Sequence, residues 1–348
     1  MTLTTRRHDI DWLRVIAIGL LLIYHIAIGF QPWGVFIGFI QNGKPLEWIW
    51  TPMSLFNIWR IPLLFFVSGM GVYFAIQRRD WKGLLLERSK RILLPFIFGM
   101  IVIVPLHVFL WQDYYSQDIA YMLNPGHLWF LGNIFVYVLV LSPLFFLLKK
   151  HPDGKFQQSL SKLLSNPVGL LVLMIPFVLE AELVKPDTFE LYAMTTHGFW
   201  IGLIAFMVGF LCVFSGLEFW NTVTKWKWLL LGMAVTLFAV RLLVFDLEAP
   251  RYLTAIESNL WIFTVFGIGY TYLNRPSKAL SYLSSAAYPI YIIHMVFLYL
   301  GSVLLFDTGL PAVIKYLLLV VFTMGGCFLT YEFVIRRVRF LRPLFGLK

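Results

Sequence analysis

Residues 12–30 read WLRVIAIGLLLIYHIAIGF, and this stretch decides the class of the fold. Its only basic side chains are Arg14 and His25, and it has no acidic one. A helix of this length rises about 29 Å, close to the hydrocarbon thickness of a bilayer. Because no small-residue cleavage site follows, we expect a retained transmembrane helix rather than a signal peptide.

Similar apolar runs recur along the whole chain of 348 residues. Nine further stretches of about 20 residues meet the same criterion. The fifth span of the ten is short, and it ends at either residue 181 or residue 184. The sequence therefore predicts an all-α integral membrane protein with about ten transmembrane helices. The predicted spans are 12–30, 53–76, 92–111, 127–148, 168–181, 198–215, 228–246, 255–273, 285–305 and 313–334.

Composition excludes several other classes. Hydrophobic residues make up 59% and charged residues 13% of the chain, whereas soluble domains carry roughly 25% charged residues. The 33 Phe and 13 Trp exclude a disordered chain, and two cysteines, Cys212 and Cys327, cannot form a disulfide framework. Long continuous runs also differ from the short alternating segments of an outer-membrane barrel.

The net charge of +10 is explained by topology. With the N-terminus inside, 21 of the 28 lysines and arginines fall on the cytoplasmic side and only four outside. This asymmetry predicts that both termini are cytoplasmic. It also argues against nucleic acid as a partner and for the lipid bilayer. We expect one domain, 1–348, with no appended soluble domain.

Arg14 and His25 form the clearest polar pair within a span. Eleven helical steps of 100° bring both side chains to one face, separated by about 16 Å of rise. Ionisable groups inside a membrane mark functional sites, so this face is typical of a substrate path. The alternative is that Arg14 reaches the lipid headgroups while His25 binds a carbonyl of a neighbouring helix.

Arg60 lies a third of the way along the second span, just before Pro62. A buried arginine needs an anion, either a substrate group or a structural carboxylate. The structural candidates are Glu180, Asp246, Glu257 and Glu332. Beyond Arg60, the small residues Ser68, Gly69 and Gly71 favour close approach of another helix or a ligand.

Arg88 and Arg91 are three residues apart in ERSKRILLPF, at the predicted start of a helix. Two guanidinium groups on one face beside a helix N-terminus suit a phosphate. The alternative is a cationic anchor that fixes the topology.

Further polar and aromatic residues enter other spans. His127, Trp129 and Asn133 open the fourth span, where an outer vestibule is expected, and Tyr288, Tyr291 and His294 repeat every three residues along the ninth. His107 and His197 are interpreted as interfacial. No metal motif and no Gly-x-Ser-x-Gly is present, so a histidine acting as general base on a hydroxyl is the chemistry that fits.

These motifs together resemble the acyltransferase 3 family over nearly the whole chain, from about Asp9 to Arg337. The branch containing glucans biosynthesis protein C is similar in PLEW at 45–48 and FNIWRIPLLFFVSGMG at 56–71. The family motifs are Arg14-x10-His25, LFFVSG at 64–69, Arg88-x-x-Arg91 before Pro95-Phe96, GHLWFL at 126–131 and YPIYIIH at 288–294.

The resemblance implies a multi-pass enzyme of the bacterial inner membrane that transfers an acyl group from cytoplasmic acyl-CoA to a carbohydrate hydroxyl. His25 and Arg14 would be catalytic, and Arg88 and Arg91 would bind the CoA phosphates. We assign Arg60, His127, Trp129, Tyr288 and His294 to substrate binding. No permanently bound cofactor is expected, and the acyl group, acetyl or succinyl, stays open.

Two other classes remain as alternatives. A transporter or flippase would use Arg14, His25 and His294 to line a proton or substrate path, but it has no need of the Arg88 and Arg91 pair. A membrane sensor or scaffold would find His25 dispensable. The oligomeric state, including a homo-oligomer, is not fixed by the sequence, nor is the need for a separate periplasmic partner.

Overall fold

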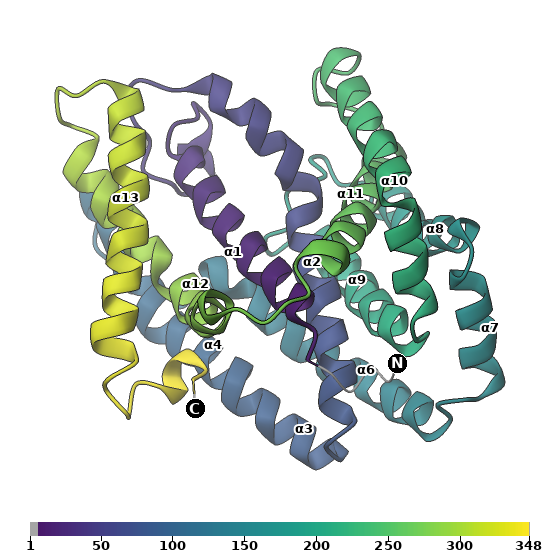
Figure 1. Ribbon diagram of the computed structural model, residues 1–348. Helices are drawn as coiled ribbons and strands as arrows, with labels where there is room; N and C mark the ends of the chain where they lie inside the picture. Colours follow the sequence, from purple (N-terminus) through teal and green to yellow (C-terminus); the bar gives the residue numbers. More distant parts are fainter. Residues whose placement is uncertain (1–5, 348) are drawn as a thin grey trace. The chain divides into compact units, whose positions relative to one another are not determined.

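The computed structural model describes residues 6–347 and is helical throughout (Figure 1). Helices make up 77% of it and none of the described residues lies in a strand, which confirms the all-α prediction. Its α-helices are α1 His8–Ile28, α2 Trp50–Ile76, α3 Trp81–Arg88, α4 Leu94–Phe98, α5 Val104–Tyr114, α6 Trp129–Lys150, α7 Lys155–Leu164, α8 Pro167–Val184, α9 Thr196–Phe214, α10 Glu218–Leu243, α11 Arg251–Tyr272, α12 Lys278–Leu305 and α13 Ala312–Thr330.

Shorter turns extend or join these helices. Three are π-helical and lie within longer helical runs, so that residues 81–114 form one continuous stretch. The π segments are η3 Ser89–Leu93, η4 Gly99–Ile103 and η6 Tyr331–Ile335, and the 3-10 segments are η1 Gly34–Ile37, η2 Glu47–Ile49, η5 Gly126–Leu128 and η7 Pro343–Phe345.

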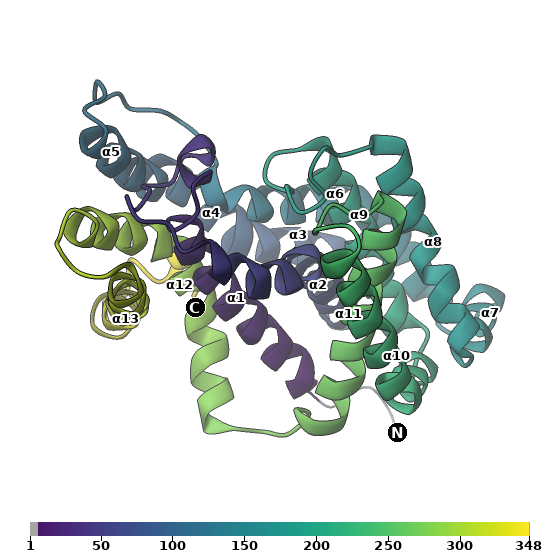
Figure 2. The same ribbon diagram turned by 90° about the horizontal axis from the view of Figure 1, so that it is seen from above.

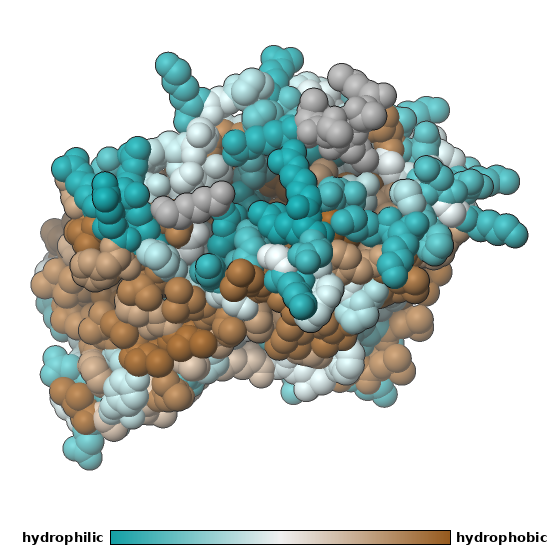
Figure 3. Space-filling model, turned by 90° about the horizontal axis from the view of Figure 1, so that it is seen from below, coloured by the Kyte–Doolittle hydropathy of each residue, from teal (hydrophilic) through white to brown (hydrophobic). Residues whose placement is uncertain are grey.

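Within residues 6–347, nine helical stretches are long and apolar enough to cross a membrane, and each overlaps a predicted span. The remaining predicted span, 255–273, forms α11, whose Glu257, Ser258 and Asn259 lower its hydropathy. The fifth span extends to Val184. Hydrophobic residues cover a broad part of the surface in Figure 3, and hydrophilic residues gather mainly above them in that view.

The chain divides into two compact units, each assembled from three separated segments. Unit 1 contains the described residues up to Ala17, then Leu55–Leu86 and Asn133–Ser281. Unit 2 contains Ile18–Ser54, Glu87–Gly132 and the chain from Tyr282 onward. The expectation of one domain over 1–348 without an appended soluble domain stays a prediction.

Unit 1 is organised around Pro62, which lies inside α2. Proline has no N–H, so the carbonyl of Ile58, four residues earlier, loses its helical donor. The hydroxyls of Tyr192 and Ser258 both donate to that oxygen, each at 2.8 Å. One proline therefore fixes the loop before α9 and the middle of α11 against α2. Elsewhere in this unit, α8 and α10 lie beside α11 (Figures 1 and 2).

Helices α2 and α9 approach so closely that two positions admit only glycine. A Cβ on Gly69 would lie 1.9 Å from the carbonyl oxygen of Phe206, and one on Gly209 would lie 2.1 Å from that of Phe66. This confirms the close approach expected at Gly69. At Gly71 a Cβ would meet open space, so no neighbouring helix packs against that position, and approach of a ligand there stays a prediction.

Unit 2 encloses the loop that follows α1. The backbone N–H groups of Asn42 and Leu46 donate to the carbonyls of Gly29 and Phe30, each at 2.8 Å, and fold the loop back on the end of α1. The hydroxyl of Tyr299 in α12 donates to Gly38 O at 2.6 Å. These bonds hold the loop against α12. They also position Phe39 of this loop, whose ring packs against that of His25.

Candidate active site

His25 in α1 and His294 in α12 form the centre of unit 2. Their Nδ1 and Nε2 atoms, respectively, are 2.9 Å apart, and the two ring planes differ by only 3°. On its other side, Nδ1 of His294 lies 2.6 Å from the carbonyl oxygen of Tyr291. His294 is fully buried and His25 is half-buried. The pair therefore forms a linear chain from a backbone carbonyl to the ring of His25.

This chain fixes the tautomers of two neutral imidazoles. A carbonyl oxygen only accepts, so Nδ1 of His294 must carry the proton that it donates to Tyr291. Nε2 of His294 is then an acceptor, and Nδ1 of His25 must donate to it. The lone pair of His25 is consequently at Nε2, which is the basic nitrogen of the pair.

His127 and His107 extend the cluster. Nε2 of His127 lies 3.0 Å from Ile292 O, and the Tyr291 hydroxyl donates to the carbonyl of His127. The His127 ring centroid is 5.0 Å from that of His294 and 5.5 Å from that of His107. Four histidines from α1, α5, η5 and α12 thus converge. His107 is only 5% exposed, so it is packed inside the protein, and its interfacial depth stays a prediction.

Aromatic rings pack against two histidines of this cluster. The ring centroid of Phe39 lies 5.7 Å from that of His25, and the ring of Tyr299 lies 5.0 Å from that of His107. Trp129, the first residue of α6, is 9% exposed. Over residues 6–347, no group of three or more His, Cys, Asp or Glu side chains converges in the manner of a metal site. The hydrogen-bonded chain from Tyr291 O to His25 suits these histidines to proton transfer.

Arg88 and Arg91 lie elsewhere in unit 2 and share one carboxylate. Glu87 lies 3.4 Å from Nε of Arg88 and 3.3 Å from Nε of Arg91. The expected helix N-terminus beside them was wrong, because the continuous helical stretch begins earlier, at Trp81. The sequence signal was misleading since Pro95, which suggests a helix start, is accommodated within the stretch between two π turns.

Tyr288 is electrostatically coupled to Arg88, and its buried hydroxyl has no hydrogen-bond partner among the described residues. The chain end packs nearby, since a Cβ on Gly346 would lie 2.6 Å from Cε1 of Tyr288. The predicted stripe on α12 is confirmed further along, where the ring centroids of Tyr291 and His294 are 5.9 Å apart.

The continuous helix α1 carries both Arg14 and His25, as predicted. Arg14 belongs to unit 1, where its Nη2 lies 2.7 Å from Asp11 and its side chain is 42% exposed. Arg60, also in unit 1, is 2% exposed. Asn57 precedes it by three residues and is also buried, and neither of its amide atoms has a partner in residues 6–347.

The carboxylates considered for Arg60 are mostly engaged with other cations. Glu257 pairs with Arg241 at 2.6 Å, Glu180 with His197 at 2.9 Å, and Glu332 with Arg336 at 2.9 Å. Asp246 is exposed. His197 is 2% exposed and therefore packed inside the protein, and its interfacial depth stays a prediction. The presence of Arg241 within a span was the available signal for its ion pair.

Cys212 and Cys327 are both buried and free. No curated protein and no solved structure matches this chain. A family model described as an acyltransferase domain does match, and it covers residues 7–332. This match takes in the Arg14–His25 helix, the arginine pair and all four clustered histidines. The chain therefore belongs to the acyltransferase 3 family and is a multi-pass membrane acyltransferase.

Proposed function

We propose that this membrane acyltransferase transfers an acetyl or succinyl group from acyl-CoA to a carbohydrate hydroxyl, with Nε2 of His25 as the general base. The observation that carries the proposal is the buried chain from Tyr291 O through His294 to His25. A base held by a second group that fixes its tautomer is the arrangement that hydroxyl activation needs.

The reaction requires one proton transfer in each direction. Nε2 of His25 removes the proton of the acceptor hydroxyl as its oxygen attacks the thioester carbon. A C–O bond forms and the C–S bond breaks, and the imidazolium then returns the proton to the CoA thiolate. His294 stabilises that imidazolium by accepting from Nδ1 of His25, and the full burial of His294 strengthens the interaction.

The donor is assigned to the cytoplasmic side, where the excess of basic residues places Arg88 and Arg91. Glu87 lies between their guanidinium groups as a phosphate would, so CoA binding requires the phosphates to replace that carboxylate. Tyr288 supplies a buried hydroxyl beside Arg88. Arg14, on the same helix as His25, is proposed to hold the polar part of the donor.

The acceptor is assigned to the opposite side of the bacterial inner membrane, as a glycan of the cell envelope. Nδ1 of His127 is buried without a hydrogen-bond partner in the described part of the chain, and it suits a sugar hydroxyl. Trp129 provides an adjoining aromatic side chain. For a succinyl donor, Arg60 would bind the distal carboxylate, and the neighbouring Asn57 amide supports that assignment.

Loss of the base gives the direct test. In His25→Ala, acyl transfer by purified protein is expected to fall by about 10²–10⁴-fold, the usual contribution of a general base. His151→Ala, at an exposed loop histidine, is the control and should retain full turnover. A folded His25→Ala variant with unchanged turnover would contradict the proposed mechanism.

A second experiment separates the enzyme from a transporter that uses the same polar residues. Thermal unfolding is measured in detergent with acetyl-CoA, succinyl-CoA or free CoA. A specific ligand at 100 times its Kd stabilises a protein by about 2.7 kcal/mol, so binding is expected to raise Tm, most for the true donor. Equal Tm values with and without all three compounds would favour transport.

A further inference from the structure

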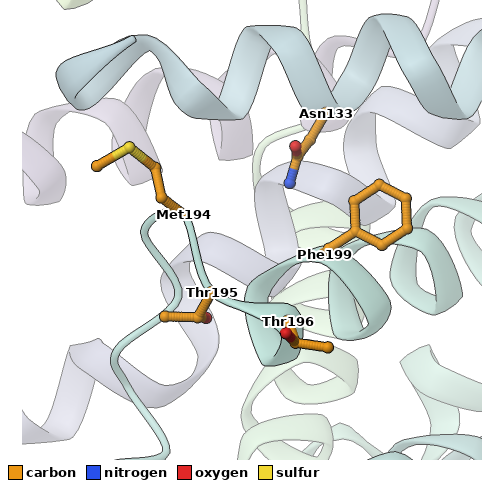
Figure 4. A pocket seen from close by; sticks show the side chains of 5 residues that line it. All are labelled: Asn133, Met194, Thr195, Thr196 and Phe199. Carbon is orange, nitrogen blue, oxygen red and sulfur yellow. The ribbon is translucent and has the colours of Figure 1, made fainter. Parts of the chain in front are cut away.

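A cavity of about 390 Å³, open to the surface, lies in unit 1. It is lined by Asn133 of α6 and by the start of α9 and the loop before it, and Figure 4 shows the side chain of Asn133 projecting from α6 toward that loop. The lining residues are Asn133, Met194, Thr195, Thr196 and Phe199. Its volume lies in the range of small-molecule sites.

The hydroxyl of Tyr137 links α6 and α9, the two helices that form the walls of the cavity. Tyr137 of α6 lies one helical turn after Asn133, is fully buried and donates to Phe199 O at 2.6 Å. A Cβ on Gly202 would lie 2.6 Å from that hydroxyl, so only glycine leaves room for it in α9. Asn133 and Phe199 are therefore preorganised on packed helices.

The rim of the cavity is also fixed. Thr195 caps α9 by accepting from Gly198 N at 2.9 Å, and the loop before it is anchored by Tyr192, whose hydroxyl bonds Ile58 O. Between them, Met194 adopts a left-handed backbone with φ of 56°. Such a conformation in a residue with a side chain is strained and persists where the surroundings enforce it.

The lining specifies the chemistry of a ligand. It contains an aromatic ring, an amide and hydroxyls but no ionisable side chain. An anion such as a CoA phosphate or a succinyl carboxylate would lose hydration there without gaining a counter-charge. A neutral polyhydroxy ring instead finds donors and acceptors at Asn133 and Thr196 and an apolar surface at Phe199.

We infer that this cavity binds a neutral sugar ring of the acceptor glycan. The inference rests on the proposed function for calling that sugar the acceptor. Asn133 follows His127 by six residues in the uninterrupted η5–α6 segment, so the cavity wall and a candidate acceptor-binding histidine share one helical element.

The test measures sugar binding without acyl transfer. Saturation-transfer NMR is recorded with cellobiose on the full chain in a detergent that has no sugar headgroup, with glucuronate as the charged comparator. Cellobiose is expected to give signal and glucuronate little. In Phe199→Ala and Asn133→Leu the affinity should fall by about tenfold, as expected when about 1.4 kcal/mol of ring or amide contact is lost.

Two matched variants serve as controls. Phe199→Tyr keeps the ring and should keep binding, and Trp200→Ala removes the neighbouring ring, which is 45% exposed and does not line the cavity. Equal cellobiose affinity in folded Phe199→Ala and wild type, or equal binding of glucuronate, would overturn the inference. His25→Ala should still bind cellobiose, so failure of the proposed catalytic step would leave this measurement unaffected.

Discussion

Nδ1 of His25 lies 2.9 Å from Nε2 of His294, although 269 residues separate the two histidines in the chain. Nδ1 of His294 is in turn 2.6 Å from a backbone carbonyl that can only accept. The second histidine thus orients the first and determines which of its nitrogens is basic.

Replacement of His294 tests this relationship. In His294→Ala, Nδ1 of His25 loses its acceptor, so kcat is expected to fall by about 10²-fold with little change in KM for acyl-CoA. His294→Asn offers a carbonyl oxygen to the same N–H and should recover part of the rate. Steady-state kinetics of both variants decide the matter, and equal losses in the two would indicate that His294 serves only to fill space.

Replacing the Arg88 and Arg91 pair and replacing Glu87 are expected to change KM for acyl-CoA in opposite directions. In Arg88→Gln with Arg91→Gln, KM for acyl-CoA should rise by about 10–100-fold, since charged hydrogen bonds contribute about 1.5–3 kcal/mol. Glu87→Gln removes the carboxylate charge that competes with the CoA phosphates and should lower KM. Lys90→Gln, within the same π turn, is the control. Loss of membrane insertion in the double variant would instead favour a topological anchor.

The buried Arg241–Glu257 pair in unit 1 is expected to affect stability rather than turnover. Arg241→Met leaves a buried carboxylate without its cation, which costs about 3–5 kcal/mol, and adding Glu257→Leu should restore most of it. The exposed Arg336–Glu332 pair is the control, because water screens a surface pair and its removal should leave Tm nearly unchanged. Tm values in detergent measure both, and a double variant no better than Arg241→Met would contradict this account.

Stability should also depend on pH through Glu190, in the loop between α8 and α9. Burial raises the pKa of its carboxyl above the ordinary 4.5, and the nearby cation of Arg241 offsets this only in part. A raised folded-state pKa favours the protonated form, so stability is full below the ordinary pKa and is lost as the pH rises through the folded value.

Glu190→Gln removes that titration. Its Tm should exceed that of the wild type at about pH 7.5 and equal it near pH 4. Asp187→Asn, at an exposed position in the same loop, should leave the pH dependence of Tm unchanged. Parallel Tm profiles for Glu190→Gln and wild type would show that the ionised carboxylate is well solvated.

The sequence alone determined the membrane class, the positions of the spans and the placement of Arg14 and His25 on one helix. These features depend on hydropathy and helical period, which are properties of neighbouring residues. The sequence also indicated His127, Tyr288 and His294 as polar or aromatic residues within predicted spans. It contained the family motifs that the matched domain covers.

Tertiary structure alone decided which of these residues meet. His107 joins the cluster, Glu257 pairs with Arg241 rather than with Arg60, and the helix of Arg88 and Arg91 begins at Trp81. Each outcome depends on contacts between segments far apart in the chain, where buried polar groups must find partners. Local pattern places a side chain on a helix face, but only the packing of the helices gives that face its neighbours.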